Sequence, residues 1–337
     1  MKKIFRKKIL VRVDASREIG LGHVYNMTTL LRYFKDAQIL IVMNSQHKLG
    51  SIKFKKLNYK IKYFSIQSDL WKIINEFKPN MIFNDILNTK SKYMKDLKKF
   101  NSMIVNFEDL GHGRRYADLV FNPIYYSKKK EKNEFYGEKY ACVREEFRKS
   151  SKINIKKNVR KVVITFGGTD PTNKTSQILK IIHNSNLSDI EFNVILGLGY
   201  LEKEHIKKIV YPMRLDGFKI NIIEKTDTIS KFIKDCDFAI TSNGRTTFEI
   251  ASMKVPMISI AVNSRERTHS FVKNSKSGLH LNVTSNIDKK ILLNYINQMQ
   301  EINTRKKFIK NMKKMNILNG IIRVVKIINE KYENRNN

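Results

Sequence analysis

Short apolar runs alternate with segments of helical periodicity along most of the chain. The alternation extends from Lys8–Val13 to Ala117–Phe121 and begins again from Lys161–Thr165 to Val255–Ala261. Strands that alternate with helices indicate a parallel sheet covered by helices. A chain of 337 residues can form two domains of ordinary size. The sequence therefore predicts an α/β fold of two doubly wound, Rossmann-like domains.

The domains are expected at residues 1–150 and 159–330, because a polar, lysine-rich stretch at 149–158 has the composition of a linker. Open parallel sheets bind ligands at the carboxyl ends of their strands. Both domains are therefore expected to point their strand-end loops into a cleft at their interface.

The chain carries 65 Lys and Arg against 31 Asp and Glu, a net charge of +34. Such a charge suggests nucleic acid, an anionic membrane surface or an anionic small substrate as partner. The excess is mostly lysine and is spread along the chain, which is also typical of compositional bias at neutral surface positions. No basic stretch has the interleaved aromatic residues of an RNA-binding sheet. We therefore expect no nucleic-acid partner, and keep peripheral contact with an anionic membrane as an open alternative.

No segment approaches the ~18–20 consecutive apolar residues of a membrane-spanning helix. The basic N-terminus lacks both a long apolar core and a small-residue cleavage site. These features predict a cytoplasmic protein whose N-terminus leads into the first strand. The Asp, Glu, His and Cys residues show no metal-ligand spacing, so neither a metal nor another cofactor is expected.

The first candidate motif is Asp14 followed by Gly20-Leu-Gly22-His23, between a strand and a helix that starts near His23. Glycines let the backbone pass close to a ligand. The positive potential of a helix N-terminus favours a neutral imidazole, which is the form a general base requires. Spacing alone leaves a helix-capping histidine without catalytic importance equally open.

The second motif is Phe166-Gly167-Gly168-Thr169-Asp-Pro171, again between a strand and a helix. The glycines permit a tight turn that presents amides to a phosphate, and Thr169 adds a hydroxyl. The motif lacks the lysine of a Walker loop and the third glycine of the dinucleotide fingerprint. A purely structural turn remains the alternative.

The third motif is Ser242-Asn-Gly244-Arg-Thr-Thr-Phe-Glu249, a loop that enters a helix. Glu249 lies about one turn inside that helix, where it could accept hydrogen bonds from two ribose hydroxyls. A lone helical glutamate is more often a solvated charge. The pairing with the Gly167 loop favours the binding role, because two strand-end loops of one domain would then contact diphosphate and ribose.

The ordered motifs resemble the hydrolases of pseudaminic-acid synthesis, which cleave a UDP-linked 2,4-diacetamido-trideoxy sugar, and the related spore-coat polysaccharide proteins. These proteins have the two-domain GT-B fold. The resemblance covers about residues 10 to 270. The matching segments are Arg12–Asp14 with Gly20–His23, Phe107–Gly113 before Tyr116–Leu119, Val143–Phe147, Phe166–Pro171, and Asn243–Ser252 with Asn263–His269.

The resemblance implies that His23 is the general base that activates water against the anomeric carbon, with inversion and release of UDP. It implies that Arg144 and Asn263 hold substrate and that Glu249 binds the ribose. Asp14 is expected to orient the His23 loop because it lies close in sequence. The N-terminal domain would then hold the catalytic histidine and the acceptor or water, and the C-terminal domain the nucleotide. The remaining candidate contacts to substrate are Gly22, Gly167, Gly168, Thr169 and Gly244.

The chain departs from the pseudaminic hydrolases at Asn84-Asp-Ile-Leu87, where those enzymes carry His-Tyr-Gly. The tyrosine that approaches the sugar is missing, so the sugar stays undetermined. The leading hypothesis is a UDP-sugar hydrolase in nonulosonic-acid or surface-polysaccharide synthesis. The alternatives are an inverting GT-B glycosyltransferase with a lipid or surface-glycan acceptor, a nucleic-acid-binding module, and a catalytically inactive sugar-binding homologue.

Overall fold

The computed structural model describes residues 7–129, 131–149, 155–224, 226, 228–282 and 285–336. Half of the expected linker, residues 150–154, and residues 1–6 before the first strand lie outside these ranges. The chain divides into two compact units: unit 1 comprises residues 1–142 and 319–337, and unit 2 comprises residues 143–318.

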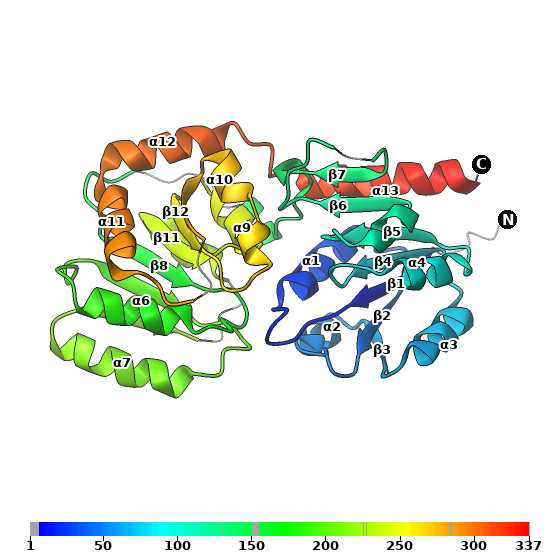
Figure 1. The fold of residues 1–337 in the computed structure, drawn as a ribbon, viewed down its shortest axis with the longest axis horizontal. Coiled ribbons are helices and arrows are strands. Elements are labelled where there is room, and N and C mark those ends of the chain that lie inside the picture. Colours follow the sequence, from blue (N-terminus) through cyan, green and yellow to red (C-terminus); the bar gives the residue numbers. More distant parts are fainter. Residues whose placement is uncertain are drawn as a thin grey trace. The chain divides into compact units, whose positions relative to one another are not determined.

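In unit 1, the described strands form one parallel sheet of seven in the order β3-β2-β1-β4-β5-β6-β7 (Figure 1). The winding reverses between β1 and β4, which is the switch point of a doubly wound fold. The strands are β1 (Lys8–Val13), β2 (Gln38–Asn44), β3 (Lys60–Phe64), β4 (Met81–Asp85), β5 (Met103–Phe107), β6 (Leu119–Asn122) and β7 (Glu134–Tyr136).

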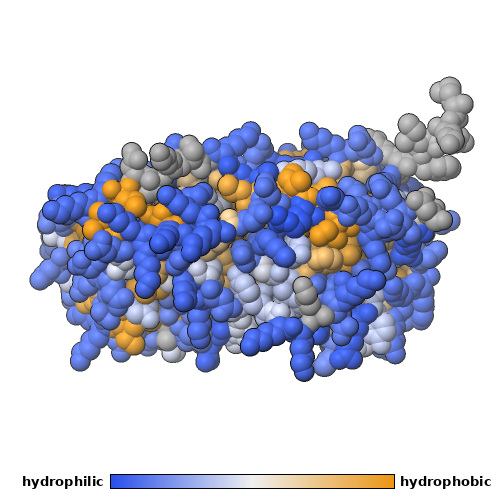
Figure 2. Space-filling model, turned by 90° about the horizontal axis from the view of Figure 1, so that it is seen from above, coloured by the Kyte–Doolittle hydropathy of each residue, from blue (hydrophilic) through white to orange (hydrophobic). Residues whose placement is uncertain are grey.

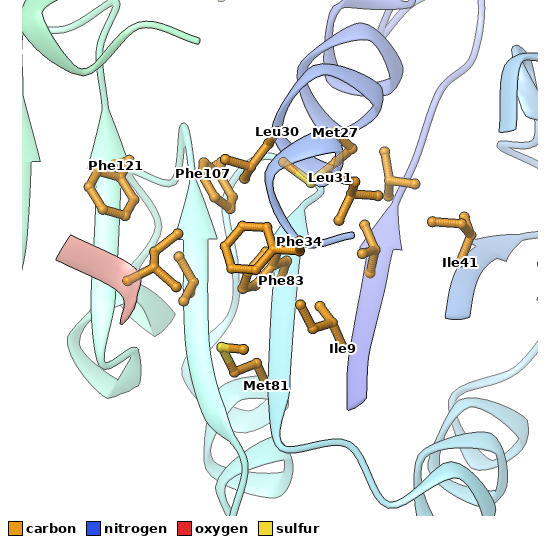
Figure 3. Close-up of a cluster of buried hydrophobic side chains, with 14 of the residues drawn as sticks. Ile9, Met27, Leu30, Leu31, Phe34, Ile41, Met81, Phe83, Phe107 and Phe121 are labelled. Atoms are coloured by element: carbon orange, nitrogen blue, oxygen red, sulfur yellow. The ribbon is translucent and has the colours of Figure 1, made fainter. Parts of the chain in front are cut away.

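Successive strand residues point to opposite sides of this sheet, and a buried core covers each side. Val11 belongs to the core on one face and Leu10 to the core on the other. Figure 3 shows the first of these cores, where Phe34, Phe83 and Phe107 lie together. The helices of unit 1 are α1 (Gly22–Leu30), α2 (Ser51–Lys56), α3 (Gln67–Phe77), α4 (Ser91–Lys98) and α13 (Gly320–Asn336), with short 3-10 turns at Leu31–Tyr33, His112–Tyr116 and Glu138–Tyr140.

The C-terminal helix α13 lies beside β6 and β7 (Figure 1). Its residues Ile321, Val324 and Ile328 are buried in the same core as Phe107 and Phe121. The expected C-terminal domain at 159–330 therefore differs from the observed unit. The apolar face of the last helix completes the core of unit 1. The N-terminal stretch of unit 1 ends at residue 142 instead of 150.

In unit 2, the described strands form a parallel sheet of six in the order β10-β9-β8-β11-β12-β13. Figure 1 labels β8, β11 and β12 of this sheet. The switch point of the sheet lies between β8 and β11. The strands are β8 (Lys161–Thr165), β9 (Glu191–Ile195), β10 (Lys219–Ile223), β11 (Phe238–Ser242), β12 (Met257–Ile260) and β13 (Gly278–Leu281). The helices are α5 (Glu145–Arg148), α6 (Lys174–His183), α7 (Lys203–Leu215), α8 (Ser230–Asp235), α9 (Thr246–Ser252), α10 (Phe271–Ser275), α11 (Lys289–Gln300) and α12 (Ile302–Lys313), with a 3-10 turn at Glu266–Thr268.

The prediction of two doubly wound α/β domains is confirmed by these sheets. Figure 2 shows that hydrophilic side chains cover most of one face of the molecule, with apolar side chains gathered in separate patches. Within the described ranges, no helix is both long and apolar enough to cross a membrane.

Candidate active site

His23 is the second residue of α1, the helix that follows the first strand of unit 1. Its side chain meets Asp85, the last residue of β4, whose register partner on β1 is Val13. The His23 Nδ1 atom lies 2.5 Å from Asp85 Oδ1. Asn26, one turn further along α1, donates from Nδ2 to Asp85 Oδ2 over 2.7 Å. These three side chains form a hydrogen-bonded group at the switch point, where doubly wound sheets place their ligands.

The chemistry of this group follows from its buried carboxylate. Asp85 is 0% exposed and His23 is 4% exposed. An ionised carboxylate only accepts hydrogen bonds, so Nδ1 of His23 carries the proton of the shared bond. In a neutral ring, this tautomer leaves the lone pair on Nε2. Asp85 thus orients the imidazole and stabilises the positive charge that forms when Nε2 takes a proton.

Asp14 was expected to orient the His23 loop, and its side-chain contacts are with Arg12, Asn44 and His47. Asp14 forms an ion pair with Arg12 and accepts a hydrogen bond from the backbone amide of Asn44 at 3.3 Å. The Nδ1 atom of His47 lies 3.8 Å from its Oδ2. Asp14 therefore braces β1 against the end of β2, and the partner of His23 comes instead from the neighbouring strand β4.

A second polar network lies at the carboxyl ends of β4 and β5. Asn84 donates to Asn106 Oδ1 over 2.9 Å, and Asn106 donates to Asp109 Oδ2 over 2.7 Å. Asp109 also accepts from the Thr89 amide and hydroxyl and from the Gly111 amide. Burial raises the pKa of the Asp109 carboxyl, and these donors counteract that effect. The network ties the loops after β4 and β5 together next to Asp85.

In unit 2, the Gly167–Gly168 turn follows β8 and packs against the loop after β9. Gly167 has a φ of +68°, a conformation that glycine adopts without strain. Gly199 donates to the Gly168 carbonyl over 2.8 Å. A Cβ at Gly197 would collide with the carbonyl oxygens of Gly167 and Gly168. The predicted turn is present, and Gly197 permits the close approach that holds it. Thr169 follows the turn and is buried.

The next residue, Asp170, caps the start of α6. Its carboxylate accepts from the Lys174 amide at 2.8 Å, from the Thr175 amide at 2.9 Å and from the Thr175 hydroxyl at 2.6 Å. Burial raises the pKa of Asp170 and lowers that of Lys174. The Asp170 carboxylate thus engages the first two amides of α6.

Glu249 in α9 is held by Arg144, which directly precedes α5. The Nε and Nη2 atoms of Arg144 donate to Oε1 and Oε2 of Glu249 over 2.6 and 3.1 Å. Nη1 of Arg144 also lies 2.8 Å from Oε1 of Glu146. Two residues that were each expected to contact substrate therefore form a bidentate ion pair with one another.

Asn263 is connected to Gly244 through Glu266. Its Oδ1 accepts from the Glu266 amide at 2.9 Å, and Oε2 of Glu266 accepts from the Asn243 amide at 3.0 Å. A Cβ at Gly244 would come 2.9 Å from Oε1 of Glu266, so Gly244 leaves room for this carboxylate. An added Cβ at Gly167 would reach ordinary contact with the hydroxyl of Ser242. The loops after β8 and β11 thus lie side by side.

The structure places the candidates in two groups. Gly22 begins α1 and lies beside His23 in unit 1, while Arg144, Gly167, Gly168, Thr169, Gly244, Glu249 and Asn263 belong to unit 2. Sequence reasoning missed Asp85, Asn26 and Glu266. The signal for Asp85 was an acidic residue at the end of a buried apolar strand, where the chain departs from the pseudaminic hydrolases.

No group of three or more His, Cys, Asp or Glu side chains in the described part of the chain could hold a metal ion.

Two doubly wound units with parallel sheets define the GT-B fold class, and solved structures of this fold superpose on the chain. MurG of Acinetobacter baumannii superposes with a TM-score of 0.67 at 11% identity, covering 96% of this chain and 99% of that one. HepE of Anabaena, solved with UDP-glucose, gives 0.62 at 12% identity over 96% and 99%. A glycosyltransferase of Rickettsia africae gives 0.59 at 12% identity over 97% and 99%. At such low identity these likenesses establish the fold alone.

Two curated proteins are distant relatives of this chain in sequence. The chain is 28% identical over 277 residues to an uncharacterized protein of Methanocaldococcus jannaschii, covering 77% of this chain and 57% of that protein. It is 21% identical over 333 residues to the spore coat polysaccharide biosynthesis protein SpsG of Bacillus subtilis, covering 95% and 97%. The first of these matches, to the Methanocaldococcus protein, spans little more than half of that protein. The chain matches no protein-family model.

Proposed function

We propose that this chain is an enzyme that cleaves the bond between UDP and the anomeric carbon of a UDP-sugar, and that it transfers the sugar to an acceptor. The observation that carries the proposal is the buried contact between His23 and Asp85, because it supplies an oriented base at the ligand-binding edge of a GT-B sheet. The likeness to HepE, solved with UDP-glucose, and to a glycosyltransferase supports the substrate class and transfer.

In the proposed reaction, the acceptor hydroxyl attacks the anomeric carbon while Nε2 of His23 takes its proton. The bond from the anomeric carbon to the phosphate oxygen breaks, and UDP leaves with the electron pair. Because one displacement occurs, the configuration at the anomeric carbon inverts. Asp85 holds Nδ1 throughout and balances the charge of the imidazolium, and Asn26 fixes Asp85.

Unit 2 is proposed to bind the nucleotide. The Gly167–Gly168 turn, Thr169 and Gly244 would lie against the diphosphate, where backbone amides stabilise the leaving group. Glu249 would receive the ribose hydroxyls. Arg144 occupies one hydrogen-bonding position on each Glu249 oxygen, and each oxygen has a second lone pair for a hydroxyl. The ion pair would thus orient Glu249 for this contact.

Asn263 is proposed to contribute to the same site from the neighbouring loop. Its Oδ1 is engaged with the Glu266 amide, which leaves the Nδ2 donor for substrate.

Hydrolysis is the second candidate, and the burial of His23 favours it. A base that is 4% exposed is more easily reached by water than by a large acceptor. The resemblance to the pseudaminic hydrolases adds a UDP-linked 2,4-diacetamido-trideoxy sugar as a candidate substrate. In this version water replaces the acceptor hydroxyl, and every other step is unchanged.

The experiment is a panel of UDP-, GDP- and CMP-sugars, incubated with and without acceptor extracts and followed by mass spectrometry. UDP released only when an acceptor is present supports transfer. UDP released at the same rate without an acceptor supports hydrolysis and replaces the first version by the second. Absence of release from every UDP-sugar under both conditions contradicts the proposal.

A further inference from the structure

The segment from β2 to α3 in unit 1 combines positive charge with exposed apolar side chains. Between Asp36 and Asp69 the chain has no Asp or Glu. The same stretch carries six lysines, at positions 48, 53, 55, 56, 60 and 62. Of these, Lys62 is paired with Glu76 of α3. This edge of the protein therefore presents a positive surface that acidic residues of its own segment do not neutralise.

The same segment also exposes apolar side chains to solvent. Ile52 of α2 is 54% exposed and Ile66, just after β3, is 62% exposed. Leu57 and Tyr63 are also exposed. A single exposed apolar residue is normal on a protein surface, whereas apolar side chains that gather in one place mark an interaction surface. We call residues 45–66 the β3 edge.

The β3 edge is one compact structure. Ser45 donates its amide to the Phe64 carbonyl over 2.9 Å, and the hydroxyls of Ser45 and Ser65 lie 2.9 Å apart. Phe54 of α2 is fully buried in the core, and its ring packs edge-on against Tyr59. The inner side of α2 is thus fixed, while Ile52, Lys55 and Lys56 face solvent.

The β3 edge is also joined to the loop that leads into the His23 helix. The Ala15 amide donates to the His47 carbonyl over 2.9 Å, and the Leu49 amide donates to the Ala15 carbonyl over 3.0 Å. Gly50 lies against Leu21, the residue before α1, and a Cβ there would come 2.6 Å from its side chain. The β3 edge and the proposed base therefore belong to the same unit, and backbone hydrogen bonds connect the β3 edge to the loop before α1.

We propose that the β3 edge docks the protein on an anionic phospholipid surface, and that the acceptor of the sugar is presented by this surface. The second part rests on the proposed function. Lysines attract anionic headgroups, while Ile52 and Ile66 enter the boundary between headgroups and acyl chains. Isoleucine and leucine neither stack on bases nor donate hydrogen bonds to them, so this combination fits a lipid surface better than a nucleic acid.

The test is co-sedimentation of the full chain with vesicles of equimolar phosphatidylcholine and phosphatidylglycerol. We expect binding that weakens as salt is raised, and no binding to vesicles of phosphatidylcholine alone. Lys55→Gln with Lys56→Gln should weaken binding about 25-fold, since each lysine near an anionic surface contributes about a fivefold factor. Ile66→Ser should weaken the binding that remains at high salt.

The matched control is Lys306→Gln with Lys307→Gln, which removes the same charge from the exposed face of α12 in unit 2. It should bind vesicles as the unmodified chain does. An equal loss in the control, or no binding to anionic vesicles at low salt, overturns the proposal. A dimer in light scattering that Ile66→Ser converts to a monomer overturns it as well, because the edge would then face a second copy.

Failure of docking and failure of the proposed function are separable. Vesicle binding is measured without any nucleotide sugar, and UDP release from a soluble UDP-sugar is measured without vesicles. Lys55→Gln with Lys56→Gln should keep that release, since neither residue belongs to the proposed site. Vesicle binding without cleavage of any nucleotide sugar would leave docking standing and remove the proposed role of the acceptor.

Discussion

Nδ1 of His23 and Oδ1 of Asp85 lie 2.5 Å apart, although 62 positions separate the two residues in the chain. His23 is the second residue of the helix after β1 and Asp85 ends β4, and these strands are neighbours at the switch point. The contact is buried, and Asn26 holds the far oxygen of the carboxylate. The topology of the sheet thus assembles a base and its orienting carboxylate from distant parts of the sequence.

Asp85→Asn should lower kcat for UDP release by about 10²-fold to 10⁴-fold, because an amide no longer fixes the tautomer of His23. The KM should change little, since a fully buried side chain does not contact the substrate. Steady-state kinetics on the single and double variants with His23→Ala provide the check. If Asp85 acts through His23, the double variant is no slower than His23→Ala alone. A further large loss in the double variant would assign Asp85 a separate role.

Glu249→Gln should raise the Kd for UDP about tenfold or more, because a charged acceptor for hydroxyls and for Arg144 is lost. Isothermal titration calorimetry with UDP measures the effect. Glu204→Gln is the matched control, since this residue is an exposed glutamate on α7 that is paired with Lys207. Equal affinity of the Glu249 variant and the unmodified chain would exclude Glu249 from the nucleotide site.

Gly197→Ala should displace the Gly167–Gly168 turn, because the new Cβ would collide with backbone oxygens that cannot move as a side chain does. We expect a lower midpoint of thermal unfolding and weaker UDP binding. In Gly217→Ala the backbone has a φ of +85° but no neighbour lies within 4 Å of the new Cβ. That variant should lose about 1 kcal/mol of stability through backbone strain and keep its UDP affinity. Unchanged UDP binding in Gly197→Ala would argue against a role of the turn.

Ile328→Ala should lower the free energy of unfolding by about 2–5 kcal/mol, since it removes a fully buried side chain from the core of unit 1. Denaturant unfolding followed by circular dichroism provides the measurement. Ile322→Ala makes the same chemical change on the same helix, where the side chain is 46% exposed, and should have a much smaller effect. Similar losses in the two variants would contradict the packing of α13 on this unit.

The edge strands show where reading the sequence fails. The central strands β1 and β8 were expected at Lys8–Val13 and Lys161–Thr165, because a strand buried on both faces reads as an unbroken apolar run. The strand β3 contains Lys60-Ile-Lys-Tyr-Phe64 and looks polar, since an outer strand is covered on one side only. The short outer strands β7, β10 and β13 were missed for the same reason.

The sequence by itself determined the α/β class, the number of domains and the loops that carry the candidate residues, because these follow from local periodicity and from glycines in turns. Gly20-Leu-Gly22-His23 begins a helix at the predicted place. Asp14 was expected to orient the His23 loop because it is close in sequence, but the carboxylate that contacts His23 is Asp85. Side-chain partners depend on which strands are neighbours in the sheet.

Only the tertiary structure decided that Asp85 is the partner of His23, that Arg144 pairs with Glu249, and that the last helix completes the first unit. Each of these contacts joins residues far apart in the sequence. Their formation depends on strand order and on the burial of apolar faces, which the whole fold determines and a local pattern does not encode.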